Sequence, residues 1–167
     1  MADGNQKKLP EVRAAALVLL DAQGHVLLAE RPAHKELLPG WWEFHGGRIE
    51  PGEMPADCAI RETYEEVGVV ALQVEPITFI AEQRLLGTPQ EYYALVHHYL
   101  CREWEGEAYS REGQKLAWVE PSRLGEYQVL PGIEKVGEVL VQVLSASGPG
   151  TWQVEGLSES EKGKGKG

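Results

Sequence analysis

Cysteine, long apolar runs and signal-like segments are all scarce in this chain. Its 167 residues contain two cysteines, Cys58 and Cys101, which are too far apart for a metal or redox motif. We expect both to be buried free thiols, which suits a reducing, cytoplasmic setting. The longest apolar run, residues 14–20, is far shorter than the roughly 18 residues that span a bilayer. The polar start of the chain has no apolar signal-peptide core, so no membrane partner is expected.

Positive charge is also in short supply. The 16 Lys and Arg residues are outnumbered by 26 Asp and Glu residues, which gives a net charge of −10. A protein that tracks along a nucleic-acid backbone needs a Lys/Arg footprint, so we expect no nucleic-acid polymer as a partner. The charge remains compatible with a small phosphate ligand that is delivered together with metal ions.

Acidic residues concentrate in one stretch, Gly47–Val69, whose second half is predicted to be a helix. Pro55 suits a first helical turn and Gly68 suits a helix end. Apolar residues that recur at helical spacing predict one buried face, made by Ile60, Tyr64 and Val67.

Three carboxylates share one face of the predicted helix: Glu62, Glu65 and Glu66. Like-charge neighbours of this kind cost a helix about 0.2–0.5 kcal/mol per pair. A hard divalent cation removes that repulsion, and oxygen ligands suit Mg²⁺ or Mn²⁺. The alternative interpretation is a solvated acidic surface.

The stretch fits the pattern G-x5-E-x7-R-E-U-x-E-E-x-G-U, where U is apolar, at Gly47, Glu53, Arg61, Glu62, Glu65, Glu66, Gly68 and Val69. One position departs, because Thr63 stands where an apolar residue is usual. The stretch resembles the Nudix box. Two further segments, WEFHGGRIEPGE (Trp42–Glu53) and WEGEAYSREGQ (Trp104–Gln114), make the chain similar to MutT-type nucleoside triphosphate pyrophosphohydrolases, a group that includes 8-oxo-dGTP diphosphatases.

The resemblance implies an α/β fold, the Nudix α/β/α sandwich, in which a mixed curved sheet lies between the box helix and a C-terminal helix. It also implies hydrolysis of a nucleoside triphosphate to the monophosphate and pyrophosphate, with Mg²⁺, or Mn²⁺, as cofactor. It places the metal on the Gly46 carbonyl and on the carboxylates of Glu62, Glu65, Glu66 and Glu112. Either Glu62 or Glu112 is the candidate general base, and the sequence leaves this choice open.

Other residues are expected beside the substrate or in support of the site. Gly46 and Gly47 carry no Cβ, so their backbone can approach a ligand closely. The resemblance places Arg31 near the substrate. Glu53 and Arg61 are expected to pair and to hold the geometry between loop and helix.

Two departures from the family pattern leave the preferred base open. His45 stands where a proline usually precedes the two glycines. Ile133 occupies the position of the Asn or Asp that recognises the base, and isoleucine cannot form such a hydrogen bond; Glu134 could take that role after a shift of one residue. The alternatives are a hydrolase of another diphosphate-linked nucleoside and a nucleotide-binding module without turnover. The clustered carboxylates argue against the second.

The rest of the chain indicates one domain. We expect residues 1–10 to be a disordered lead, residues 11–144 to be the Nudix domain and residues 145–167 to be a disordered Gly/Ser/Lys tail. Strands are predicted at 12–21, 25–30, 71–81, 92–102 and 115–120, a helical turn at 121–127 and an amphipathic helix at 132–144. The first two strands should form a hairpin. His97 and His98 should point to opposite faces of their strand and serve structural roles, and the protein should be a monomer or homodimer.

Overall fold

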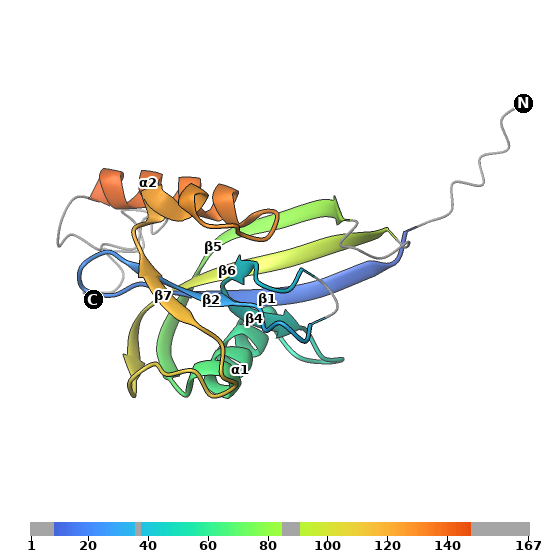
Figure 1. Cartoon of the computed structure of the whole chain (residues 1–167), viewed down its shortest axis with the longest axis horizontal. Helices are drawn as coiled ribbons and strands as arrows, with labels where there is room; N and C mark the ends of the chain where they lie inside the picture. The colour runs from blue at the N-terminus through green and yellow to red at the C-terminus, as the bar shows by residue number, and fades with distance from the viewer. Residues whose placement is uncertain (1–8, 36–37, 85–90, 148–167) are drawn as a thin grey trace, which may run out of the picture.

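The chain folds as a mixed β-sheet held between two helices (Figure 1). The computed structural model describes residues 9–35, 38–84 and 91–147. The main sheet has four strands in the order β4 (His45–Arg48), β1 (Glu11–Leu19), β6 (Tyr92–Glu105) and β5 (Val70–Arg84). Strands β1 and β6 run parallel, whereas the outer pairs are antiparallel. The expected mixed sheet in an α/β fold is thus confirmed.

A smaller antiparallel sheet lies beside the first. Its strand order is β3 (Trp42–Glu43), β2 (Val26–Glu30) and β7 (Leu116–Val119). The short 3₁₀ helix η1 (Pro121–Glu126) then leads to α2 (Ile133–Ser147). Between β2 and β3 the chain reverses, with the Arg31 N–H donating to the Trp41 carbonyl at 2.7 Å.

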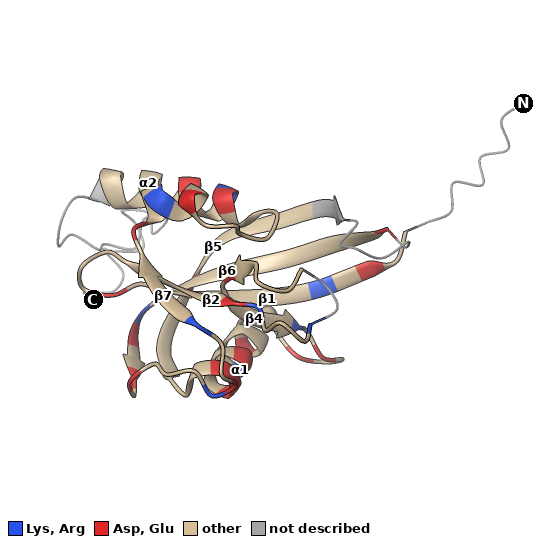
Figure 2. Ribbon diagram, viewed as in Figure 1, with Lys and Arg blue, Asp and Glu red and all other residues tan. Residues whose placement is uncertain are grey.

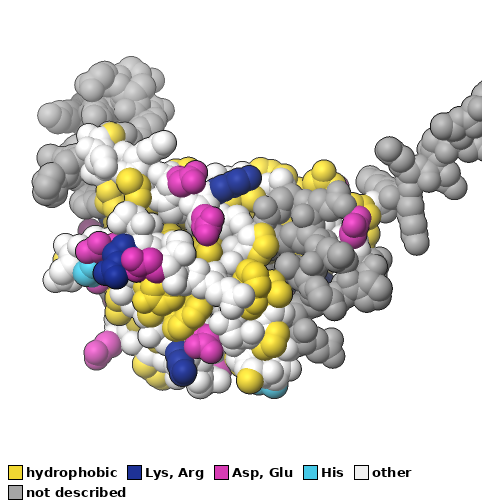
Figure 3. All heavy atoms as spheres, turned by 45° about the horizontal axis from the view of Figure 1, so that its top comes forward, with side chains coloured by type: hydrophobic (Ala, Val, Ile, Leu, Met, Phe, Trp, Pro, Cys, Tyr) yellow, Lys and Arg dark blue, Asp and Glu magenta, His cyan; other side chains and the backbone are white. Residues whose placement is uncertain are grey.

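The helices cover opposite faces of the main sheet, and each face has its own apolar cluster. Successive side chains of a strand point to opposite faces. The cluster beneath α1 (Pro55–Val67) therefore receives Ala15, Leu17 and Leu19 from β1. The cluster beneath α2 receives Ala16, Val18 and Leu20. The outer face that carries α2 shows acidic, basic and hydrophobic side chains interspersed among the residues that the structure describes (Figure 3).

The predicted hairpin between the first two strands is wrong. The chain does turn at residues 21–24, where Asp21 Oδ1 accepts the N–H of His25 at 2.8 Å and Gly24 has a φ of 81°. However, both edges of β1 are occupied by β4 and β6. Within the described ranges, a single antiparallel bridge, Leu20 to Val26, joins the two segments before β2 leaves to pair with β3 and β7.

Helix α1 begins and ends where the sequence predicts. Pro55 is its first residue, and Gly68 ends it with a φ of 75° and an N–H that donates to the Tyr64 carbonyl at 2.9 Å. The predicted buried face is partly wrong, because Tyr64 is 49% exposed. The residues buried against the sheet are Cys58, Ala59, Thr63 and Val67. Thr63 is accommodated because its hydroxyl donates to the Ala59 carbonyl at 2.7 Å.

Several element boundaries differ from the predictions. Strand β5 runs to Arg84 and α2 runs to Ser147, each three residues past its predicted end. Most of the predicted lead and tail, residues 1–8 and 148–167, lies outside the described residues. In the part of the chain that the structure describes, no helix has both the length and the apolar character needed to cross a bilayer.

Candidate active site

Acidic side chains gather on α1 and on the segments beside it, beneath the main sheet (Figure 2). Arg61 organises part of this group. Its Nε donates to Glu53 Oε2 at 2.8 Å, and Nη1 donates to Glu62 Oε1 at 2.9 Å. Nη1 also lies 3.4 Å from Glu65 Oε2. The hydrogen bonds from Arg61 lower the pKa of Glu53 to about 2, so the expected Glu53–Arg61 pair is present and stays ionised.

Glu66 lies deeper than its neighbours, with a side chain that is 17% exposed. Burial, together with the negative charges of Glu62 and Glu112, raises its pKa to about 8. Burial also raises the pKa of Glu62, against the opposing effect of Arg61. The carboxylates are therefore close enough to repel one another, and one of them holds its proton near neutral pH.

The segment between β6 and β7 brings Glu112 to this cluster. Three hydrogen bonds fasten the segment to the last turn of α1. The Tyr109 N–H donates to the Val67 carbonyl at 3.2 Å, and the Arg111 N–H donates to the Glu66 carbonyl at 3.0 Å. Arg111 Nη1 donates to the Tyr64 carbonyl at 3.0 Å. Glu112, one residue farther along, is thus held near Glu66 although 46 positions separate them in sequence.

The Gly46–Gly47 backbone of β4 forms the floor of the cluster. A Cβ at Gly47 would lie 2.5 Å from the Glu62 carboxylate, and a Cβ at Gly46 would meet the backbone of Ala15 and Ala16. Glycine at these two positions therefore lets the helix carboxylates approach the strand. The preceding residue, His45, is fully buried, and its Nδ1 lies 2.9 Å from Glu66 Oε2. Burial lowers the pKa of His45 to about 4.

A cavity of about 900 Å³ opens over this floor. Seven residues predicted for the site line it: Arg31, Gly46, Gly47, Glu62, Glu66, Glu112 and Ile133. Arg31 donates from Nη1 to Glu43 Oε2 at 3.0 Å, and burial raises the pKa of Glu43. The lining also includes the apolar side chains of Phe44, Val96, Leu130 and Ile133, which belong to or pack against the cluster beneath α2. The cavity thus combines carboxylates with apolar side chains.

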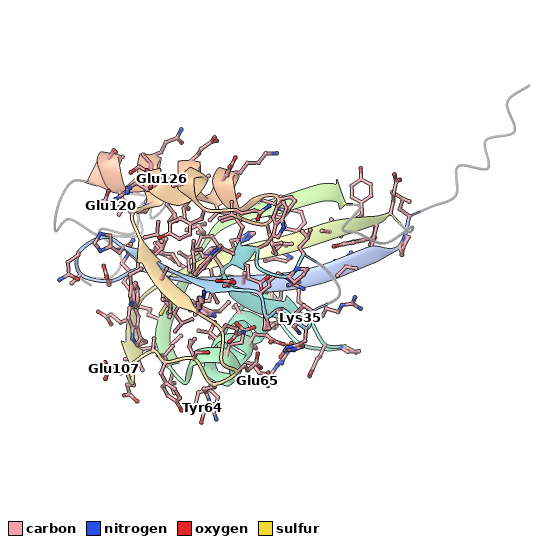
Figure 4. The ribbon with its side chains drawn as sticks, in the orientation of Figure 1. Lys35, Tyr64, Glu65, Glu107, Glu120 and Glu126 are labelled. Carbon is pink, nitrogen blue, oxygen red and sulfur yellow. The ribbon has the colours of Figure 1, made fainter. Side chains whose placement is uncertain are left out.

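Glu65 is the predicted metal ligand that the structure does not bring into this cavity. Its side chain is 53% exposed and lies beside Arg61 on the outer surface of α1 (Figure 4). Glu134, considered as a substitute for a base-reading residue, is exposed on the first turn of α2 and does not line the cavity. Ile133 does line it, while also packing in the cluster beneath α2.

A model of the NUDIX domain matches residues 10–141 of the chain. The chain belongs to the Nudix family. An 8-oxo-dGTP diphosphatase of Haemophilus influenzae is 32% identical over 125 residues, which cover 75% of this chain and 88% of that protein. A CTP pyrophosphohydrolase of Escherichia coli is 31% identical over 124 residues, covering 74% and 85%. The solution structure of the E. coli ORF135 protein has a TM-score of 0.67 at 27% identity, covering 83% of this chain and 94% of that one. The family expected from Gly47–Val69 is confirmed.

Nudix hydrolases generally need a divalent metal ion, and the donor chemistry of this Nudix chain fits one. The charges of Glu62 and Glu112 raise the pKa of Glu66, and the charge of Glu112 also raises the pKa of Glu62, so a divalent cation would relieve this repulsion. Among the residues that the structure describes, no three carboxylate, imidazole or thiolate groups yet converge on one point. Glu62 Oε1 instead accepts a hydrogen bond from Arg61.

The cavity lining includes residues that were not singled out from the sequence as site residues, among them Lys35, Glu43 and His98. Lys35 and Glu43 had no partner at a recognisable spacing, and His98 was assigned a structural role. His98 is 4% exposed, and its ring lies edge-on to Phe44 with centroids 6.4 Å apart. The alternation along β6 correctly put His97 and His98 on opposite faces, but it could not show that one face borders a cavity.

Proposed function

We propose that this Nudix protein hydrolyses nucleoside triphosphates to the monophosphate and pyrophosphate, with Mg²⁺ as the preferred metal ion. One observation carries the proposal. Three mutually repelling carboxylates, Glu62, Glu66 and Glu112, line a cavity that apolar side chains also line. A metal-bound polyphosphate suits the carboxylates and a nucleobase suits the apolar side chains.

The metal would be held by oxygen atoms of this chain. We assign the Gly46 carbonyl and the carboxylates of Glu62, Glu66 and Glu112 to it, with Glu65 joining if its side chain leaves Arg61. When bound, the metal neutralises phosphate charge and lowers the pKa of a coordinated water. Glu53 and Arg61 hold α1 against the preceding loop, so that the carboxylates keep their positions.

The reaction needs a proton acceptor and a clamp on the phosphates. Water adds to one of the two phosphorus atoms of the anhydride between the first two phosphates, and the bond from that atom to the bridging oxygen breaks. Attack on the first phosphorus expels pyrophosphate with the bridging oxygen, whereas attack on the second expels the monophosphate with the bridging oxygen and leaves the water oxygen in pyrophosphate. The proton lost by the water passes to a carboxylate, for which Glu62 and Glu112 are the candidates. Arg31 and Lys35 line the same cavity and supply the positive charge that a polyphosphate requires.

The nucleobase would lie against Phe44, Val96, Leu130 and Ile133. An apolar wall of this kind rejects near-isosteres poorly, because a wrong base leaves few buried polar groups unpaired. We therefore propose broad or weakly selective use of nucleoside triphosphates rather than strict selection of 8-oxo-dGTP. The two curated relatives of nearly equal identity are themselves named for different bases.

A turnover panel with Mg²⁺ tests this proposal. It contains the ordinary ribo- and deoxynucleoside triphosphates, 8-oxo-dGTP, ADP-ribose and a dinucleoside polyphosphate, with phosphate and pyrophosphate resolved as products. We expect pyrophosphate release from several triphosphates. Turnover of only the diphosphate-linked compounds would contradict the substrate class, and binding without any turnover would make the chain a nucleotide-binding module. Strong preference for 8-oxo-dGTP would show that a residue other than Ile133 reads the base.

We also propose a cytoplasmic protein that acts as a monomer or homodimer, without a nucleic-acid or membrane partner. Cys58 and Cys101 are both buried free thiols, which suits a reducing compartment. Light scattering of the purified chain, with and without nucleotide, gives the oligomeric state directly.

A further inference from the structure

His45 is in direct contact with the carboxylate cluster, although it lies on a different element from the helix glutamates. It is the first residue of β4, paired with Leu17 of β1, and its side chain is fully buried. Its Nδ1 lies 2.9 Å from Glu66 Oε2 across a sequence separation of 21 residues. The strand pairing fixes the backbone of His45, which lies in the chain between Phe44, which packs beneath α2, and the two glycines of the floor.

The two ring nitrogens of His45 are in different environments. A neutral imidazole has one N–H donor and one acceptor nitrogen. Nε2 is buried and has no hydrogen-bond partner among the residues that the structure describes. The contact through Nδ1 is thus the polar interaction that the structure records for this side chain. The partner of this nitrogen is a carboxylate that borders the cavity.

We propose that His45 is a positioning residue for the metal site: its Nδ1–H holds Glu66 Oε2, so that the other oxygen of Glu66 faces the cavity and can bind the metal ion. This inference rests on the proposed function, because it takes Glu66 to be a ligand. A carboxylate with one oxygen fixed loses less freedom when the other oxygen binds a cation. Hydrogen bonds of this kind to ligands typically change metal affinity by about 10- to 100-fold.

Three substitutions at His45 separate positioning from packing. The two amide side chains are not equivalent replacements: in His45→Asn the amide nitrogen falls near the place of Nδ1, whereas in His45→Gln it falls near the place of Nε2. His45→Leu keeps the approximate bulk and removes every donor. The direct readout is Mn²⁺ affinity without nucleotide, from electron paramagnetic resonance of the free ion, with urea unfolding of each variant as the stability control.

We expect His45→Leu and His45→Gln to weaken Mn²⁺ binding by about tenfold or more, and His45→Asn to stay within about threefold of the parent chain. At saturating Mg²⁺ and nucleotide, kcat of His45→Leu should recover toward the parent value. The Mg²⁺ concentration that the variant needs for turnover should stay raised. In the Glu66→Gln background, His45→Leu should have no further effect on Mn²⁺ affinity, because the carboxylate it positions is gone.

The outcomes distinguish this inference from the function beneath it. If Glu66→Gln leaves Mn²⁺ affinity unchanged, Glu66 is not a ligand, and both the site assignment and the role of His45 fail. If Glu66→Gln weakens binding but His45→Leu does not, the role of His45 alone is overturned. Equal losses in all three His45 variants, in proportion to lost stability, would also overturn it. Should His45→Leu fail to fold, the comparison of His45→Asn with His45→Gln decides between the same results.

Discussion

Glu62 and Glu66 are more buried than the other carboxylates of α1. Both line the cavity, and each raises the pKa of a neighbour or has its own pKa raised. Glu65, on the same helix, lies in solvent beside Arg61. Glu62, Glu65 and Glu66 therefore lie in different environments, although only one or three positions separate Glu65 from the other two.

We expect Glu62→Gln and Glu66→Gln each to lower kcat by at least about a hundredfold, because each removes a ligand charge or a proton acceptor. Steady-state turnover of a nucleoside triphosphate with Mg²⁺ measures this, and circular dichroism checks the fold. Glu138→Gln, the same change on the exposed face of α2, is the matched control and should keep the parent rate. Near-normal rates in the folded site variants would remove the assignment.

Loss of the Glu66 proton makes the metal-free protein less stable as the pH rises. The folded pKa of about 8 exceeds the ordinary 4.5, so its contribution is complete below about pH 4.5 and is lost as the pH rises through 8. His45 opposes this at lower pH, because its folded pKa of about 4 lies below the ordinary 6.5 and its contribution grows up to that pH. The net fall should therefore appear between about pH 6.5 and 8.

Urea unfolding in the presence of a chelator checks this pH dependence. One group of this kind gives a slope of at most about 1.4 kcal/mol per pH unit. Glu66→Gln should flatten the curve between pH 6.5 and 8, since glutamine does not titrate. The same slope in parent and variant would assign the pH dependence to another group.

The C-terminal end of α1 joins two elements of the site. Gly68 ends the helix with a φ of 75°, and a Cβ there would lie 2.9 Å from Tyr109 Cε1 in the segment that carries Glu112. Glycine is needed here twice, once for the backbone conformation and once for the close approach of the Glu112 segment.

We predict that Gly68→Ala lowers the free energy of unfolding by more than about 1 kcal/mol and also lowers turnover, because Tyr109 must move. Gly24→Ala provides the control. Gly24 has a similar φ of 81°, but a Cβ there would meet nothing within 4 Å. It should show the backbone strain alone, with turnover unchanged. Equal effects of both variants on stability and rate would mean that the Tyr109 contact is unimportant.

At the level of elements, the sequence predicted what local chemistry determines. Pro55 and Gly68 bounded α1 correctly, and alternation placed His97 and His98 on opposite faces of β6. The predictions from sequence failed where a partner distant in the chain decides the structure. The hairpin was wrong because β4 and β6 occupy the edges of β1, and Tyr64 was wrongly buried because Arg111, 47 residues later, stacks on it instead. The His45–Glu66 contact has no local sequence signature for the same reason.

In the molecule as a whole, the main sheet separates two apolar clusters that have different roles. The cluster beneath α1 supports the carboxylates, whereas the cluster beneath α2 includes the fully buried Val136 and Leu140. Damage to the second should reduce stability without changing the ligands of the first.

We expect Leu140→Ala to lower the free energy of unfolding by about 2–5 kcal/mol, through lost burial and the cavity left behind. Mn²⁺ affinity, measured at a temperature where the variant is fully folded, should remain within about twofold of the parent value. Urea unfolding and metal titration on the same sample check both parts. A large loss of Mn²⁺ affinity in the folded variant would show that the two faces of the sheet are coupled.

The carboxylates and the apolar side chains of the cavity come from different parts of the chain. Glu62 and Glu66 belong to α1 and Glu112 to the segment before β7, whereas Val96 belongs to β6, Leu130 precedes α2 and Ile133 is its first residue. Under the proposed function, substitutions at these three apolar positions can therefore accumulate over generations without touching the residues assigned to the metal ion and the proton. A lineage with this architecture would then exchange one nucleotide for another in small, viable steps, and a laboratory library confined to these three positions would sample the same evolutionary route.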